Sequence, residues 1–128
     1  MNRLLLDTHI FLWAIIDSPN LSNSAKRLIQ TTPDVYVSVL SLFELKAKAA
    51  KGKLRLPDNL MELIDEQQFS ILDLTPVQLG AYRIFHNANN DPIDNALLAI
   101  AESAHCLFLT ADQKIVVLQN STPWIIKA

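Results

Sequence analysis

Residues 3–7 have the sequence Arg-Leu-Leu-Leu-Asp, three consecutive leucines that end in an acid. A run this short and this apolar is typical of a strand that is buried on both faces. Three further segments have a similar character and contain β-branched or aromatic residues, at 35–39, 69–74 and 106–110. Residues 124–126 are a candidate for a last strand.

Longer periodic segments separate these strands and predict helices. They cover residues 10–16, 23–30, 41–52, 58–67, 76–86 and 92–104, with a short helix after Asp112. Typical helix boundaries accompany them, such as Thr75-Pro76 at a start and Gly52 at an end. Because buried strands alternate with helices, we predict an α/β fold, a three-layer sandwich with a central parallel sheet covered on both faces.

Length and composition limit the possible functions. The 128 residues suit a single domain spanning 1–128, and the net charge of −2 argues against binding nucleic acid by bulk positive charge. Two glycines are too few for a Gly-rich dinucleotide fingerprint or a P-loop, and one cysteine excludes an internal disulfide and Cys-based zinc motifs. The longest apolar run, 10–16, is too short for a membrane helix, and no signal peptide is evident. We therefore expect a cytoplasmic protein without a membrane segment.

Four acids stand just after predicted strands or in the first turn of a predicted helix. Asp7 ends the first strand, and Glu44 is placed in the first turn of the helix after the second. Asp94 lies in the first turn of a later helix, and Asp112 lies two residues beyond another strand. Because sites in open α/β sheets form beyond the carboxyl ends of the strands, these four carboxylates are expected to converge there.

Each acid also has a purely structural explanation. Ser41 and Glu44 have the spacing of a capping box, and Asp7, Asp91 and Asp112 can each cap the helix that follows. Capping does not require several acids to meet, however, and clustered carboxylates repel one another unless a cation lies between them. All-oxygen ligands suit Mg²⁺ or Mn²⁺, and such an ion promotes phosphate chemistry by activating water and neutralising charge.

Four sequence blocks then resemble a PIN (PilT N-terminus) domain, most closely the VapC-like toxins of bacterial toxin–antitoxin pairs. The blocks occur in family order and span nearly the whole chain, at residues 4–9, 38–44, 91–101 and 109–112. The resemblance implies a Mg²⁺- or Mn²⁺-dependent endoribonuclease that hydrolyses RNA without a covalent enzyme intermediate. It assigns catalysis and metal binding to Asp7, Glu44, Asp94 and Asp112.

The same resemblance gives roles to neighbouring residues and implies partners. Thr110, Thr8 and Asp91 are expected to support the four carboxylates from beside them. Many of these toxins have Asp-Pro-Phe-Asp-Arg where this chain has Ile93 and Asn95 in place of the Phe and the Arg. The resemblance also implies a homodimer and a cognate antitoxin protein whose tail enters the acidic cleft.

Basic and apolar residues add two further expectations. Lys46, Lys48 and Lys51 belong to a lysine-rich stretch that is either a solvated helix face or a track that contacts RNA phosphates. His9 lies at the predicted sheet edge, where it could touch substrate. The apolar residues of segment 10–16 exceed what one amphipathic helix face needs, which suggests a hydrophobic interface.

Two other classes of function remain open from the residues alone. One is a phosphatase-type phosphoryl-transfer enzyme in which Asp7 is the nucleophile, although His9 stands where such enzymes have a second aspartate. The other is a catalytically inactive module that only binds a partner. A receiver-like module fits poorly, because its candidate phosphoacceptor, Asp73, lies within a predicted strand.

Overall fold

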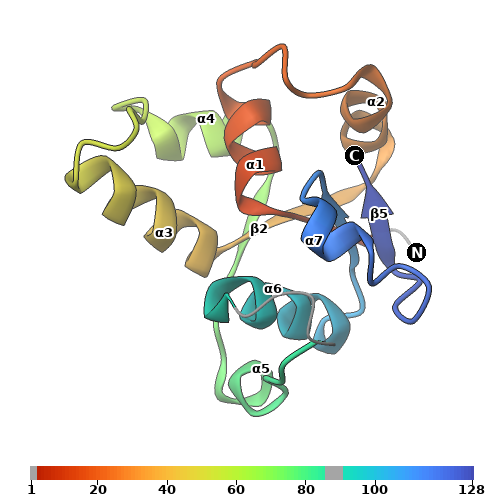
Figure 1. The fold of residues 1–128 in the computed structure, drawn as a ribbon. Coiled ribbons are helices and arrows are strands. Elements are labelled where there is room, and N and C mark those ends of the chain that lie inside the picture. Colours follow the sequence, from red (N-terminus) through yellow and green to blue (C-terminus); the bar gives the residue numbers. More distant parts are fainter. Residues whose placement is uncertain (1–2, 86–90) are drawn as a thin grey trace.

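Five parallel strands form the centre of the fold in residues 3–85 and 91–128, the part of the chain that the computed structural model describes (Figure 1). In the order β3-β2-β1-β4-β5, the strands are β3 (Ser70–Leu72), β2 (Asp34–Ser38), β1 (Arg3–Leu6), β4 (Leu107–Thr110) and β5 (Ile125–Lys127). Every neighbouring pair is parallel, so all five carboxyl ends lie at one edge. The predicted α/β class and parallel sheet are confirmed.

Alternate residues of β1 point into two different cores. Leu4 and Leu6 belong to one cluster of buried side chains and Leu5 to the other, and all three are fully buried. This alternation follows from the two-residue period of a strand. Because both faces of β1 are buried, every one of the three positions requires an apolar residue such as leucine. The sheet is therefore the middle layer of three, as predicted.

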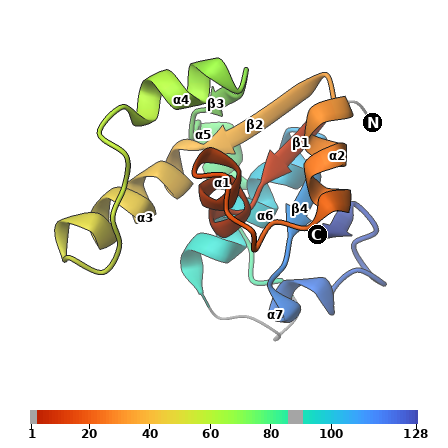
Figure 2. The same cartoon turned by 90° about the horizontal axis from the view of Figure 1, so that it is seen from above.

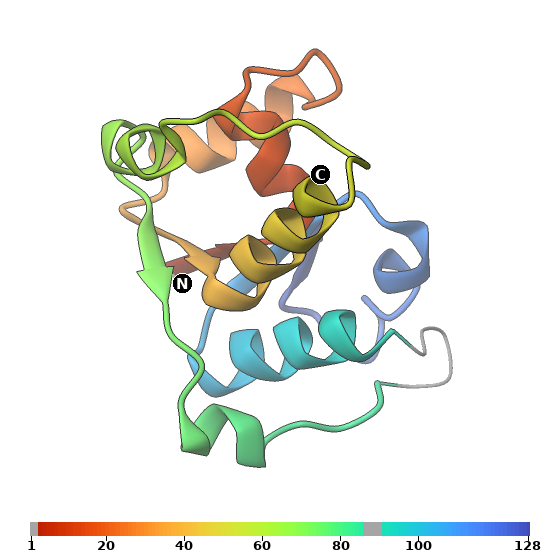
Figure 3. The same ribbon diagram turned by 90° about the vertical axis from the view of Figure 1, so that its left-hand side faces the viewer.

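Helices cover both faces of the sheet. The seven are α1 (Thr8–Ile15), α2 (Asn23–Thr31), α3 (Val39–Ala50), α4 (Leu60–Glu66), α5 (Pro76–Gly80), α6 (Pro92–Ser103) and α7 (Gln113–Val116) in the described ranges. Helices α1, α2 and α4 lie on one side and α6 on the other (Figure 1). Helix α3 continues outward from the end of β2 and contacts both α1 and α6 (Figures 2 and 3). It therefore connects the two outer layers.

Several helix boundaries differ from the prediction by one or more residues, and those of α3 and α5 change the interpretation of the sequence. Helix α3 begins at Val39, because the Ser38 hydroxyl accepts a hydrogen bond from the Leu40 amide at 3.1 Å. Ser41 is thus inside the helix, so the predicted capping box with Glu44 is wrong, as is the placement of Glu44 in the first turn. Helix α5 ends at Gly80 instead of continuing, and its predicted end at His86 lies outside the described residues.

The apolar residues of α1 serve mainly the core. Phe11 is fully buried, and Leu12 and Trp13 pack half-buried against the same cluster, because α1 contacts α3 and α4 as well as the sheet. Of this segment, Ile16 remains exposed. The excess of apolar side chains therefore reflects contact on several sides rather than a large bare surface. In the described ranges, no helix has the length and apolar character needed to cross a membrane.

Candidate active site

All four predicted acids line one cavity at the carboxyl edge of the sheet. Its volume is about 210 Å³, and Asp7, Glu44, Asp94 and Asp112 reach it from four separate elements or their caps. The remaining lining residues are Thr8, His9, Lys48, Asp91 and Lys114. The parallel sheet and the outward course of α3 bring these residues together, although they are far apart in the sequence.

Asp7 is fixed by hydrogen bonds to both carboxylate oxygens. Its Oδ1 accepts from the Thr8 amide at 2.8 Å, which caps α1, and its Oδ2 accepts from the Thr110 hydroxyl at 2.6 Å. The residue is only 6% exposed. Asp7 is therefore both a helix cap and a held carboxylate at the floor of the cavity.

The fully buried Thr110 hydroxyl connects two of the acids. While it donates to Asp7, the same oxygen accepts from the Asp112 amide at 3.0 Å. The Asp112 carboxylate in turn accepts from the Lys114 amide at 3.0 Å and caps α7. One hydroxyl thus bridges the first and last acids.

A second buried contact joins α1 to α3. The hydroxyls of Thr8 and Ser41 lie 2.8 Å apart, and both residues are buried. Glu44 is three residues after Ser41 and so lies on the same face of α3. This contact places the Glu44 carboxylate over the cavity. Sequence reasoning assigned Ser41 to a helix cap and therefore missed this positioning role.

Burial raises the pKa of the Asp7 carboxyl above the usual value of an aspartate. The hydrogen bonds from Thr110 and from the Thr8 amide act in the opposite direction, as does His9, whereas the nearby Asp112 charge adds to the increase. A carboxylate that is costly to ionise gains free energy when a cation comes close to it. The electrostatics of Asp7 therefore favour a positively charged ligand in the cavity.

The start of α6 separates the roles of two aspartates. Asp91 Oδ1 accepts from the amides of Ile93 at 2.8 Å and Asp94 at 3.2 Å, so Asp91 is the helix cap. Asn95, where the resemblance leads us to expect arginine, is buried and accepts from the Phe85 amide at 3.1 Å. Asn95 therefore holds the chain segment before α6 and does not supply a cation to the cavity.

Replacing the cap should affect stability more than chemistry. We expect Asp91→Ala to lower the free energy of unfolding by about 1 kcal/mol, the usual value of an N-cap, and to leave most RNA cleavage intact. Chemical denaturation and a cleavage assay measure the two effects. An inactive Asp91→Ala protein of normal stability would show that the roles of Asp91 and Asp94 have been exchanged.

The predicted lysine track is only partly at the cavity. Lys48 lines it and lies 3.6 Å from a carboxylate oxygen of Glu44, Nζ to Oε2, whereas Lys46 and Lys51 are exposed and do not line it. Lys114 also lines the cavity and was missed, because a single lysine in a short helix gives no signal in the sequence. Positive charge thus reaches the acids from two helices.

The donor chemistry of the cavity suits a hydrated divalent cation. In residues 3–85 and 91–128, no three His, Cys, Asp or Glu side chains are arranged so that they could hold a metal ion by themselves. Mg²⁺ retains several waters and is usually held by one or two carboxylates together with substrate phosphates. Carboxylates that line one cavity without surrounding the ion completely therefore have the right ligand chemistry for a Mg²⁺ ion that keeps part of its water shell.

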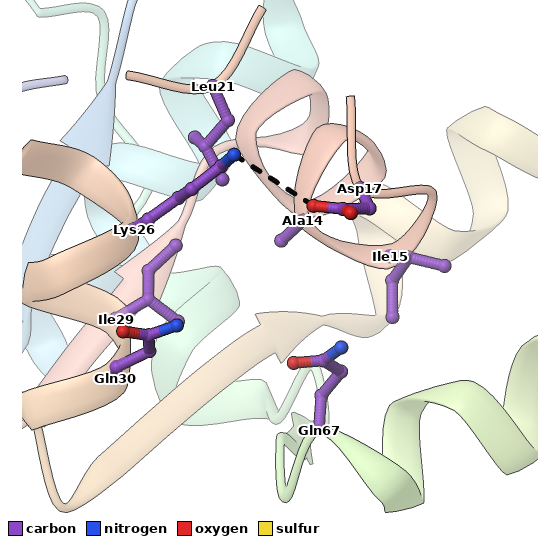
Figure 4. A pocket seen from close by; sticks show the side chains of 8 residues that line it. All are labelled: Ala14, Ile15, Asp17, Leu21, Lys26, Ile29, Gln30 and Gln67. Carbon is purple, nitrogen blue, oxygen red and sulfur yellow. Dashed lines mark ion pairs between the residues drawn. The ribbon is translucent and has the colours of Figure 1, made fainter. Parts of the chain in front are cut away.

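Another cavity, of about 270 Å³, provides a contrast. It lies between α1, α2 and the end of α4, and its lining is mainly aliphatic and amide side chains (Figure 4). Among the described residues that line it there is one acid, Asp17, which lies 3.9 Å from Lys26, Oδ1 to Nζ. It therefore lacks grouped acids, and the carboxyl-edge cavity remains the candidate active site.

Comparisons with known proteins place the chain in a family. The model of the PIN domain matches residues 4–119. The fold resembles solved structures, among them the crystal structure of VapBC2 from Rickettsia felis bound to a DNA fragment from their promoter, with 17% identity and a TM-score of 0.61 over 98% of this chain and 97% of that one. No curated protein matches the chain significantly. The chain belongs to the PIN-domain family, whose members are generally nucleases that use divalent metal ions.

Proposed function

We propose that this protein is a Mg²⁺- or Mn²⁺-dependent endoribonuclease and the toxin of a toxin–antitoxin pair. The observation that carries the proposal is the convergence of Asp7, Glu44, Asp94 and Asp112 on one cavity at the carboxyl edge of the sheet. Membership of a nuclease family supports the reaction class. The resemblance in fold to the VapBC2 structure supports the toxin assignment.

In this proposal each group at the cavity has a distinct task. The four carboxylates would hold a hydrated cation, in part through its waters, and the cation would supply charge neutralisation on the phosphate and a lower pKa for water. Thr110 orients Asp7 relative to Asp112, and the Thr8–Ser41 contact orients Glu44. Lys48 and Lys114 counter the negative charge that would otherwise repel the RNA backbone.

The test is cleavage of single-stranded RNA by the purified protein. We expect cleavage with Mg²⁺ or Mn²⁺, none with excess EDTA, and recovery when Mn²⁺ is restored. Asp94→Asn, purified in parallel, is the control for contaminating nucleases and should be inactive. Full cleavage in EDTA would contradict the proposal, and a trapped phosphoenzyme would favour the phosphatase alternative.

The two lysines at the cavity should contribute to RNA binding. We expect Lys48→Gln and Lys114→Gln each to weaken RNA binding and to reduce the slope of log K against log salt by about 0.7, the value for one phosphate contact on a single strand. Lys46→Gln is the matched control, since Lys46 is exposed on the same helix but does not line the cavity. Equal effects at all three positions would indicate general electrostatic attraction between the protein and RNA rather than phosphate contacts at the cavity.

We also propose a homodimer and an antitoxin partner. Val77, Leu79 and Ile84 are 76%, 61% and 62% exposed, a concentration of apolar side chains on and after α5 that supports an interface. We expect a dimer by light scattering at micromolar concentration and a shift toward monomer in Leu79→Asp. A monomeric wild-type protein would contradict the dimer and leave the nuclease proposal intact.

A further inference from the structure

A second cavity, of about 300 Å³, adjoins the acidic one. The two share Asp7, His9 and Asp112, and the second adds Trp13 and Ala111. Its volume is at the lower end of those that hold small ligands. One wall of the candidate active site thus continues directly into a space lined by two aromatic rings.

The two rings lie on one face of α1. His9 and Trp13 are four residues apart, and their ring centroids are 6.2 Å apart with planes tilted by 44°. The rings therefore do not stack face to face. Trp13 is half-buried against the core, which fixes its indole, whereas His9 is exposed. Ala111, which also lines this cavity, has a small side chain.

We propose that this cavity is a subsite for an unpaired nucleobase, which stacks on the indole of Trp13 with the His9 ring at its edge, while the adjoining phosphate lies at the carboxylates. The inference rests on the proposed function and adds to it a base-binding subsite beside the carboxylates. Single-stranded nucleic acids are bound by this combination of a backbone contact and an aromatic platform. A base within a duplex has both faces covered by its neighbours and is excluded.

Packing against the core holds the Trp13 ring in place, whereas the exposed His9 ring is accessible to a ligand. The other tryptophan, Trp124, packs edge-on against Phe85 in the opposite core, with planes at 86°. Trp124 lines a pocket near the start of β4, away from the carboxyl edge. Of the two indoles, only that of Trp13 is next to the carboxylates, which allows its fluorescence to report the subsite.

The experiment uses the full chain with Trp124→Phe, so that Trp13 is the only tryptophan, and Asp94→Asn, so that bound RNA is not cleaved. Because Asp94→Asn is expected to weaken Mn²⁺ binding, octaadenylate is titrated at a Mn²⁺ concentration that saturates this variant, while indole fluorescence and, separately, binding anisotropy are recorded. We expect quenching on binding. In the same background, Trp13→Leu should bind about tenfold more weakly, the order expected from loss of one stacked base, and Trp13→Phe should be intermediate.

Phe43→Leu and duplex octaadenylate are the controls, and His9→Ala is a second test variant. Phe43→Leu removes an exposed aromatic ring on α3 that lines neither cavity, and its affinity should be unchanged. His9→Ala alters an exposed side chain, so it should fold normally and still bind several-fold more weakly. Octaadenylate annealed to its complement should bind Trp13→Leu and the parent chain equally.

The outcomes separate the subsite from the nuclease proposal. If RNA binds with unchanged fluorescence, and Trp13→Leu and His9→Ala bind as tightly as the parent chain, the subsite is overturned while the nuclease proposal stands. If the wild-type protein neither binds nor cleaves RNA in Mn²⁺, the proposed function itself fails and the subsite fails with it.

Discussion

Asp7→Asn should abolish RNA cleavage and raise the melting temperature of the metal-free protein. Asparagine keeps an oxygen that can accept from the Thr8 amide, and its NH2 group would donate to the Thr110 hydroxyl oxygen, which reverses the hydrogen bond that Asp7 accepts there. The substitution removes the charge that a bound cation would require. We expect a loss of activity greater than about 100-fold, since groups that only support metal ligands already contribute about 10- to 100-fold. The melting temperature should rise because a buried charge is no longer present.

The gain in stability should depend on pH. Burial raises the pKa of Asp7, so the folded state holds this proton more tightly than the unfolded chain does. The stability contributed by this group is therefore present at low pH and is lost as the pH rises from about 3.9, the ordinary value, through the raised folded value. The difference in melting temperature between Asp7→Asn and wild type should widen between pH 4 and pH 7.

Measurements in EDTA and in Mn²⁺ complete this test. Mn²⁺ should stabilise the wild-type protein and not the variant, which reduces the difference in melting temperature between them. A difference that is constant with pH, or a variant that melts lower than wild type, would show that Asp7 acts mainly as a helix cap.

Thr110→Val should lower both stability and activity, although it preserves the shape of the side chain. The Asp7 carboxylate would lose a donor and the Asp112 amide an acceptor, and both groups border a fully buried position. The expected cost is about 1–3 kcal/mol, or about 3–15 °C in melting temperature. Cleavage should fall about 10- to 100-fold, as for other groups that orient metal ligands.

Thr110→Ser is the matched control because it keeps the hydroxyl and removes only a methyl group. It should retain most of the activity, and calorimetric melting together with cleavage rates in Mn²⁺ measures both variants. If valine and serine behave alike, the hydroxyl does not position the acids, and the contribution of Thr110 is one of packing.

The fold was predictable because its signals are local. The three leucines of β1 require apolar surroundings on both sides, and Asp91-Pro92 has the chemistry of a helix start. The end of α5 was predicted too late. Helix α5 ends at Gly80, and its Val77 and Leu79 side chains remain exposed. Where such a helix ends depends on tertiary contacts, and the periodicity of apolar residues in the sequence does not predict those contacts.

The site was predictable where the acids follow strands directly. Asp7 and Asp112 flank neighbouring strands, so parallel topology alone brings them together. Glu44 depends instead on the exact start of α3, which Ser38 sets and which the Ser41–Glu44 spacing obscured. Lys114 and the Thr8–Ser41 contact depend on how separate helices pack. A single sequence motif does not predict such contacts between residues that are far apart in the chain.

The most direct test of a shared carboxylate site is a Mn²⁺ binding isotherm, followed by the electron paramagnetic resonance signal of the free ion. Wild type would be compared with Asp7→Asn, Glu44→Gln, Asp94→Asn and Asp112→Asn, with Asp17→Asn as the control acid from the other cavity. We predict saturable binding that each of the four substitutions weakens strongly and that Asp17→Asn leaves unchanged. Wild-type binding no tighter than that of the four variants would contradict the account.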